Sequence, residues 1–141
     1  MKNEAKKLRG IGLKVTPQRL AILKMIQGDR THPSAEKIYS AMSKEYPGMS
    51  FATVYNTLSK LVEAGEIQEL DIDPNKKRFD PYTPLHYHFY CKTCGEVYDV
   101  DYDVSLTPNI KKIAGHQIEA VQLTFKGICK NCTKEQKLTK K

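Results

Sequence analysis

Apolar residues recur at the three- and four-residue spacing of an amphipathic helix in successive segments of the first 65 residues. Each segment follows a good helix-capping residue, Thr16, Ser34 or Ser50, and ends at glycine or proline. A short charged segment that ends near residues 10–12 precedes them. The pattern predicts four helices, of which the last three cover residues 17–28, 35–46 and 51–65.

The last of these helices is expected to have two dissimilar faces. Its apolar stripe comprises Val54, Leu58, Leu61 and Val62. The opposite face carries small or polar residues, namely Ala52, Thr53, Asn56, Ser59 and Lys60, with Tyr55 at its flank. Small hydrogen-bonding side chains near a helix N-terminus suit entry into the major groove of DNA. An ordinary solvated face has the same pattern, and for the helix alone this plainer interpretation is favoured.

A hairpin with a basic tip is expected directly after the helices. Residues 67–72 and 78–80 have strand character and flank the turn-forming, lysine-containing segment 73–77. Three helices followed by such a hairpin make a winged helix-turn-helix, and this order favours the groove-reading interpretation. The segment from Pro81 to Pro84 is stiff and poor in backbone donors. We therefore expect a DNA-binding domain over residues 1–81, a hinge over 82–84 and a second domain over 85–141.

The second domain is expected to be a small α/β unit, which makes the whole chain α+β. Residues 86–100 are typical of two strands that meet at a Cys-x-x-Cys-Gly turn, and Thr107-Pro108 opens a short helix that includes Ile110, Ile113 and Ala114. His116 is expected to start a strand. In the last strand Val121, Leu123 and Phe125 alternate inward. A unit of about 60 residues needs a metal or a partner subunit to complete its core.

Composition and charge narrow the function. A chain of 141 residues with 40% hydrophobic positions folds but is too short for the large catalytic folds. Residues 1–60 hold 11 Lys or Arg against 4 Asp or Glu, and the remainder holds 12 of each, so the +7 excess lies at one end. This imbalance favours a polyanionic partner, although a merely soluble basic surface is the alternative. Without a membrane-length apolar run or a signal peptide, we expect a cytoplasmic protein that contacts no membrane.

All four cysteines fall in two turns of identical spacing, Cys91-Lys-Thr-Cys94 and Cys129-Lys-Asn-Cys132. Four thiolates in two such turns can bind one Zn²⁺ per chain in a closed, structural site. A disulfide framework is disfavoured in the cytoplasm, and a redox Cys-x-x-Cys would need a thioredoxin-like fold. Structural zinc is therefore the preferred interpretation.

Histidines and aspartates supply a second, harder donor set. His86 and His88 are separated by one residue on a predicted strand, so both imidazoles point to one face. Together with His32, Asp80 and Asp99 they could hold Fe²⁺, Mn²⁺ or Zn²⁺ with an open coordination position. The plainer alternative is a solvated His-Tyr-His strand with aspartates that cap turns.

Six motifs together resemble the ferric uptake regulator family, in order and over nearly the whole chain. They are Val15-Thr16-Pro17-Gln18-Arg19, His32-Pro33-Ser34-Ala35, residues 50–58, Arg78-Phe79-Asp80, His86-Tyr87-His88 and the two Cys-x-x-Cys turns. The resemblance implies a homodimeric, metal-dependent repressor that binds a palindromic operator in double-stranded DNA. It also implies that residues 85–141 are a dimerisation domain and that one regulatory Fe²⁺ or Mn²⁺ per chain is held by the five-ligand set.

Within that family the chain is most similar to the peroxide-sensing branch, because Asp80 and Asp99 stand where iron sensors typically have Glu. Leu85 and Tyr87 replace residues that often form a further metal site in iron sensors. The resemblance implies that peroxide oxidises His32 or His86 and so releases DNA. A repressor that responds to iron, manganese or zinc without sensing peroxide is the alternative.

The resemblance also implies a set of DNA contacts. It places Tyr55 on bases, Ser50, Thr53 and Asn56 near base edges or phosphates, Arg19 on the backbone, and Lys14 near the minor groove. For Tyr55 the alternative is an aromatic residue at the edge of the core. A hydrolytic metalloenzyme that uses His86, His88 and Asp99, and a zinc-ribbon scaffold protein without DNA affinity, are the rival classes.

Overall fold

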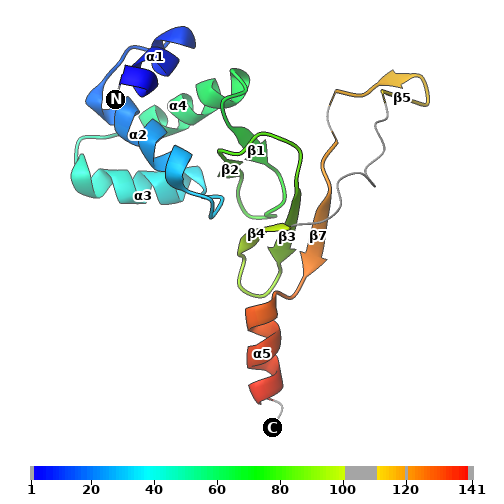
Figure 1. Cartoon of the computed structure of the whole chain (residues 1–141). Helices are drawn as coiled ribbons and strands as arrows, with labels where there is room; N and C mark the ends of the chain where they lie inside the picture. Colours follow the sequence, from blue (N-terminus) through cyan, green and yellow to red (C-terminus); the bar gives the residue numbers. More distant parts are fainter. Residues whose placement is uncertain (1, 101–110, 120, 140–141) are drawn as a thin grey trace. The chain divides into compact units, whose positions relative to one another are not determined.

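The chain forms two compact units, Met1–Thr83 and Pro84–Lys141, in this computed structural model. The structure describes residues 2–100, 111–119 and 121–139 (Figure 1). Each unit has its own hydrophobic cluster and its own strands. We describe them one after the other.

Four helices build the first unit: α1 (Lys2–Gly10), α2 (Pro17–Gly28), α3 (Ala35–Glu45) and α4 (Phe51–Glu63). The side chains of Thr16, Ser34 and Ser50 each accept a hydrogen bond from the backbone N–H three residues later, at 3.1 Å. These caps satisfy donors that have no partner within the helix, so each helix begins where the sequence predicts. The three predicted helices are confirmed, with C-terminal differences of one or two residues.

The helices bury one continuous apolar core. Its fully buried members include Leu8, Ile22, Ile38, Val54, Leu58 and Leu61. Val54, Leu58 and Leu61 are the predicted stripe of α4, and Val62 packs at the edge of this core. Truncation of one such residue to alanine costs about 2–5 kcal/mol, since the cavity left behind cannot close fully. This packing fixes which face of α4 is left to solvent.

Strands β1 (Gln68–Leu70) and β2 (Arg78–Asp80) follow α4 and pair antiparallel, with Gln68 opposite Asp80. The side chain of Phe79 is buried in the helical core, and its backbone N–H donates to the Pro33 carbonyl at 2.9 Å. The predicted hairpin is thus present and is fastened to the start of α3. Helices followed by this hairpin give the winged-helix arrangement and the α+β class.

A three-stranded sheet forms the centre of the second unit, in the order β4-β3-β7. Its strands are β3 (Tyr87–Cys91), β4 (Val97–Val100) and β7 (Thr124–Gly127). β3 runs antiparallel to β4 and parallel to β7. A small hairpin of β5 (Lys112–Ile113) and β6 (His116–Gln117) precedes β7 in the chain, and helix α5 (Lys130–Thr139) follows β7. His116 starts a strand, as expected.

Two expectations for the second unit are wrong or only partly met. Ile113 and Ala114, expected in a helix, belong to the β5–β6 hairpin; the rest of that expected helix, 107–110, lies outside the described residues. Ala114 and Gly115 have φ of 49° and 81°, and two such residues in succession make the tight turn of a hairpin and end a helix.

The apolar residues before and within β7 are not inward-facing. Val121, Leu123 and Phe125 are 39–41% exposed. Alternation along a strand indicates which residues share a face, but it does not reveal whether that face is covered. None of the described helices is long and apolar enough to cross a membrane.

Candidate functional site

The four cysteines meet at one edge of the second unit. Cys91 ends β3, Cys94 lies in the turn after it, Cys129 follows β7, and Cys132 is in the first turn of α5. Their sulfur atoms all lie within 4.8 Å of one another. A tetrahedral Zn²⁺ with Zn–S bonds of about 2.3 Å separates its sulfur ligands by about 3.8 Å. The Sγ atoms of Cys94 and Cys129 are 3.9 Å apart, so this cluster fits zinc.

Backbone hydrogen bonds favour thiolates in this cluster. Burial opposes ionisation of the Cys91 thiol, but N–H groups of Cys94 and Cys129 point at its sulfur from 3.5 and 3.3 Å. They lower the pKa of Cys91 to about 6. The pKa of Cys129 is also lowered, chiefly by the N–H of Cys132. The pKa of Cys132 is raised, chiefly by its hydrogen bond to Cys129, and a bound cation would favour its deprotonation.

Tyr98 is a neighbour of the thiols that sequence reasoning missed. Its ring packs against the cysteine cluster, and its hydroxyl forms a hydrogen bond with the sulfur of Cys129. This bond raises the pKa of Tyr98 to about 12, because loss of the phenol proton would set two negative charges side by side. The signal that could have found Tyr98 is its place opposite Phe89 in the β3–β4 pair, on the same face as Cys91.

The second unit brings three of the five predicted regulatory ligands together. His88 lies directly opposite Asp99 in the β3–β4 register. The Oδ1 atom of Asp99 is 3.0 Å from Nε2 of His86 and 3.5 Å from Nε2 of His88. His86 also places Nδ1 2.7 Å from the Pro84 carbonyl, a contact that keeps the proton on Nδ1 and leaves Nε2 as a lone-pair donor. We call these three residues the unit 2 half-set.

The first unit brings the other two predicted ligands together. Nε2 of His32 lies 3.4 Å from Oδ2 of Asp80, and both side chains are fully buried. Asp80 ends β2, and His32 lies between α2 and α3 in a left-handed conformation with φ of 59°. We call this pair the unit 1 half-set. A buried imidazole–carboxylate pair is a typical feature of a metal or catalytic site.

The donor chemistry of both half-sets fits a divalent cation. Ligand atoms bound side by side at about 2.1 Å from an ion stand about 3 Å apart, near the 3.0–3.5 Å spacings found here. Imidazole and carboxylate donors suit Fe²⁺, Mn²⁺ or Zn²⁺, whereas the four sulfurs suit Zn²⁺. The chain therefore has two chemically distinct kinds of metal-binding group.

The predicted DNA-contacting residues of α4 lie on its outward face. Tyr55 is 41% exposed and Asn56 is exposed, whereas Thr53 is half-buried. The hydroxyl of Ser50 serves as the helix cap and also lies 2.9 Å from that of Thr53. Phe51, which the sequence analysis did not select, is 39% exposed and contacts Tyr55, with ring centroids 6.2 Å apart.

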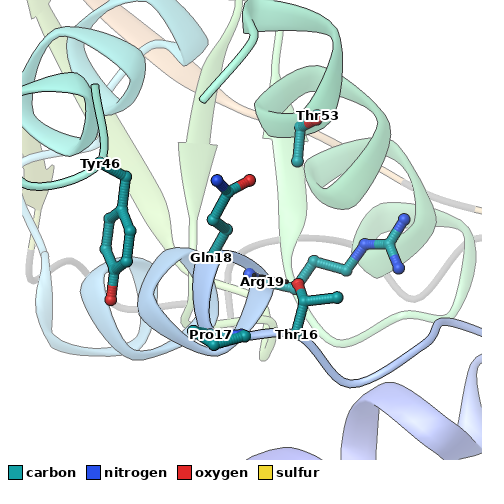
Figure 2. A pocket seen from close by; sticks show the side chains of 6 residues that line it. All are labelled: Thr16, Pro17, Gln18, Arg19, Tyr46 and Thr53. Carbon is teal, nitrogen blue, oxygen red and sulfur yellow. Dashed lines mark hydrogen bonds between the residues drawn. The ribbon is translucent and has the colours of Figure 1, made fainter. Parts of the chain in front are cut away.

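An open pocket of about 500 Å³ lies between the N-terminal ends of α2 and α4. Figure 2 shows its lining residues, which are Thr16, Pro17, Gln18, Arg19, Tyr46 and Thr53. The Arg19 guanidinium donates to the Lys14 carbonyl at 3.0 Å, which holds the segment before α2 close to the pocket. No acidic residue occurs in the first turn of either helix. Both helix N-termini are therefore positive without local compensation, as anion binding requires.

Two further polar residues support the unit 1 half-set and were also missed. Arg78 donates from Nη1 to the His32 carbonyl and from Nε to Oδ2 of Asp73, at 3.0 Å in each case. Asp73 is 6% exposed. Sequence alone identified Arg78 only as part of a motif and Asp73 only as a turn residue, because contacts over such separations depend on the fold.

Comparison with known proteins agrees with this geometry. Residues 10–126 match the Ferric uptake regulator family. The peroxide-responsive repressor PerR of Staphylococcus saprophyticus is 36% identical over 129 residues, which cover 89% of this chain and 86% of the relative.

Two solved structures extend the likeness to three dimensions. The peroxide stress regulator of Campylobacter jejuni is 29% identical, with a TM-score of 0.67 over 93% of this chain and 97% of that one. The ferric uptake regulator of Pseudomonas aeruginosa, solved with manganese, is 30% identical, with a TM-score of 0.69 over 90% and 98%. With its winged helix, its thiol cluster and its paired histidines and aspartates, the chain belongs to the ferric uptake regulator family, whose members are transcriptional regulators and not enzymes.

Proposed function

We propose that this protein is a homodimeric, metal-dependent repressor that binds palindromic operators and senses peroxide through oxidation of a histidine ligand. It would act in the cytoplasm, where its DNA lies. The observation that carries the proposal is the pairing of imidazole with aspartate in both half-sets. Similarity to PerR supports the same assignment.

The two half-sets are proposed to bind one ion jointly. His32 and Asp80 offer two ligands, and the unit 2 half-set offers three. Either group alone leaves an Fe²⁺ or Mn²⁺ ion short of the five or six ligands that it prefers. An ion that needs both groups has a higher affinity for the arrangement that unites them, and this difference lets the metal select a DNA-binding conformation.

The first unit is proposed to contact DNA. α4 would enter the major groove with Tyr55 on bases, while Ser50, Thr53 and Asn56 lie near base edges or phosphates. Arg19 at the N-terminal end of α2 would bind a backbone phosphate, and Lys14 would lie near the minor groove. In a dimer the two copies of α4 would reach half-sites one helical turn apart, about 34–36 Å.

Peroxide sensing follows from the identity of the ligands. His32, Asp80 and the unit 2 half-set would hold the ion, and Fe²⁺, unlike Mn²⁺, would supply the redox chemistry that cleaves the O–O bond of hydrogen peroxide. One peroxide oxygen would be added to the imidazole of His32 or His86 and the other would leave as water, and the oxidised imidazole would be a weaker ligand. The half-sets would separate and the operator would be released.

Mass spectrometry of the oxidised protein tests this proposal. Protein loaded with Fe²⁺ without oxygen is treated with hydrogen peroxide and digested with trypsin. The peptide of residues 31–37 contains His32 but no methionine or cysteine, so one added oxygen there identifies the imidazole. The peptide of residues 79–92 contains His86, His88 and Cys91 and requires fragmentation. Mn²⁺-loaded protein is the control, and oxygen found only on cysteine or methionine would rule out peroxide sensing.

A repressor that responds to metal alone is the second candidate, supported by the manganese-bound ferric uptake regulator of similar fold. The two functions differ in one measurement. If operator binding follows the concentration of Fe²⁺, Mn²⁺ or Zn²⁺ and is unchanged after peroxide treatment of the Fe²⁺ form, the protein is a metal sensor only.

A further inference from the structure

Arg78 links the loop that contains His32 to the tip of the β1–β2 hairpin, through a hydrogen bond to the loop and a largely buried ion pair with Asp73. Oδ2 of Asp73 accepts from Nε of Arg78 at 3.0 Å, and Oδ1 of the same carboxylate accepts from the backbone N–H of Asn75 at 2.9 Å. The second contact starts the turn over residues 73–77, so Asp73 shapes the basic tip. The guanidinium of Arg78 is thereby held from the side of the hairpin tip.

The other end of the same guanidinium holds His32. Nη1 of Arg78 donates to the His32 carbonyl at 3.0 Å, across 46 residues of sequence. His32 has φ of 59° and precedes a proline, a combination that is unfavourable for a residue with a Cβ atom. The surrounding structure must therefore hold this conformation, and Arg78 is a charged donor placed to do so.

β2 makes two more contacts with the residues that directly follow His32. The Phe79 N–H donates to the Pro33 carbonyl at 2.9 Å, and Ser34 forms a bridge with Arg78. Asp80, the next residue of the strand, places its carboxylate 3.4 Å from Nε2 of His32. The position of the His32 imidazole relative to Asp80 thus depends on β2. Lys76 and Lys77 directly precede this strand.

We propose that Arg78, held by Asp73, is a positioning residue that couples DNA contact at the hairpin tip to metal affinity at His32. The proposal rests on the function proposed above. Contact of Lys76 and Lys77 with a DNA backbone stabilises the turn that Asp73 shapes, this turn holds Arg78, and Arg78 holds His32 in the conformation that presents its imidazole. Because linkage is reciprocal, metal at His32 strengthens binding of the tip to DNA by the same factor.

The test measures Mn²⁺ affinity of the full-length protein with and without DNA. The DNA probe is a duplex recovered by in vitro selection with the Mn²⁺-loaded protein. We expect DNA to raise Mn²⁺ affinity in the unaltered protein. Arg78→Lys keeps the positive charge, but an ammonium group cannot donate to the Asp73 carboxylate and the His32 carbonyl with the geometry of the planar guanidinium. It should weaken Mn²⁺ binding by about tenfold and reduce the DNA-induced increase by at least about threefold. Asp73→Asn should act in the same direction with a smaller effect.

A matched control separates coupling from loss of charge or fold. Lys14→Gln removes one exposed charge from the proposed DNA surface without touching the hairpin tip or Arg78, and should weaken DNA binding equally with and without Mn²⁺. The thermal unfolding midpoint of each variant reports its folding, and Asp73→Asn replaces Arg78→Lys if the latter does not fold. The proposal is overturned if the folded variants keep the full DNA-induced increase. If DNA binding of the unaltered protein is indifferent to Mn²⁺, the proposed function fails instead.

Discussion

Tyr98 and Asp99 are consecutive residues of β4 whose side chains serve different metal-binding groups. Tyr98 packs on the cysteine cluster and bonds to Cys129, whereas Asp99 lies 3.0 Å from Nε2 of His86. Successive side chains of a strand point to opposite faces, so both groups depend on one register of β4 against β3. A slip by one residue would exchange the phenol and the carboxylate and remove both from their partners.

Replacement of Tyr98 by phenylalanine tests the phenol's role. Tyr98→Phe removes the hydrogen bond to Cys129 and keeps the ring, so we expect zinc to pass to a chelator about tenfold faster, an effect typical of residues that support metal ligands. The absorbance of ionised tyrosine gives a second readout, because the group with a pKa of about 12 should disappear from the titration. Tyr90→Phe, on the neighbouring strand, is the control. Equal zinc release by Tyr98→Phe and the unaltered protein would show that the phenol does not stabilise the thiolates.

Loss of one cysteine should remove the structural ion. Cys132→Ser leaves three thiolates and an open position, and we expect bound zinc, measured by elemental analysis after dialysis against EDTA, to fall from one per chain to nearly none. Since a unit of about 60 residues is near the lower limit at which a hydrophobic core alone is sufficient, the unfolding midpoint should fall by at least about 10 °C. Lys130→Gln, in the same helix turn, should retain zinc. A serine variant that keeps one EDTA-resistant zinc would contradict the four-thiolate site.

Acid should weaken the Asp73–Arg78 pair. Burial raises the pKa of Asp73, but the Asn75 N–H and the Arg78 guanidinium together lower it by more, so the pKa lies below its ordinary value. A carboxyl whose folded-state pKa is lowered contributes stability above its unfolded pKa of about 4 and loses it as pH falls through the folded value. We expect Asp73→Asn to lower the free energy of unfolding by about 1 kcal/mol at pH 7.

The pH profile of that difference is the decisive measurement. Urea unfolding of both proteins should give a constant difference between pH 5 and 7, as estimated from a pKa of about 4. The difference should shrink below about pH 4. Zinc loss in acid affects both proteins alike and cancels. A difference that persists undiminished to the lowest pH at which both fold would show that the Asp73 charge does not act through this pair.

Tyr55 should affect specific more than non-specific DNA binding. Its side chain is exposed on α4, and its ring lies beside that of Phe51. We expect Tyr55→Ala to weaken binding to a selected duplex by about 10- to 100-fold, while affinity for a scrambled duplex of equal length changes less than about threefold. Fluorescence anisotropy at constant salt measures both, and Ser40→Ala on α3 is the control. An equal loss of affinity for both duplexes would show that Tyr55 contacts the DNA backbone or supports folding and does not read bases.

The sequence predicted the local features well because their causes are local. Thr16, Ser34 and Ser50 specify helix starts through their own side chains, and four cysteines at identical spacings specify a thiol cluster. His86, directly before β3, and His88, within it, have ring centroids 4.3 Å apart because they lie two residues apart in extended backbone. Capping residues, cysteine spacing and strand alternation were therefore sufficient for these elements.

Features that depend on distant residues were not accessible in the same way. Arg78 reaches His32 across 46 positions, and Tyr98 reaches Cys129 only because β7 lies beside β3. The expected helix near Ile113 failed for a different reason, since Ala114-Gly115 can end a helix or turn a hairpin and its neighbours decide which. The exposure of Phe125 likewise depends on which part of the protein covers the sheet. The alternation of apolar and polar residues along the strand does not reveal this.

The parallel pairing of β3 with β7 has a consequence for biosynthesis. Cys91 and Cys129 are 38 positions apart, and a parallel partner must cross over before it can pair. A nascent chain therefore cannot complete this sheet until β7, which ends at Gly127, has left the ribosome. Residues 1–83 carry a complete apolar core of their own and can fold earlier. Zinc binding by the four thiols would follow this step, so zinc-starved cells should accumulate chains in which residues 1–83 are folded and the cysteine cluster is not assembled.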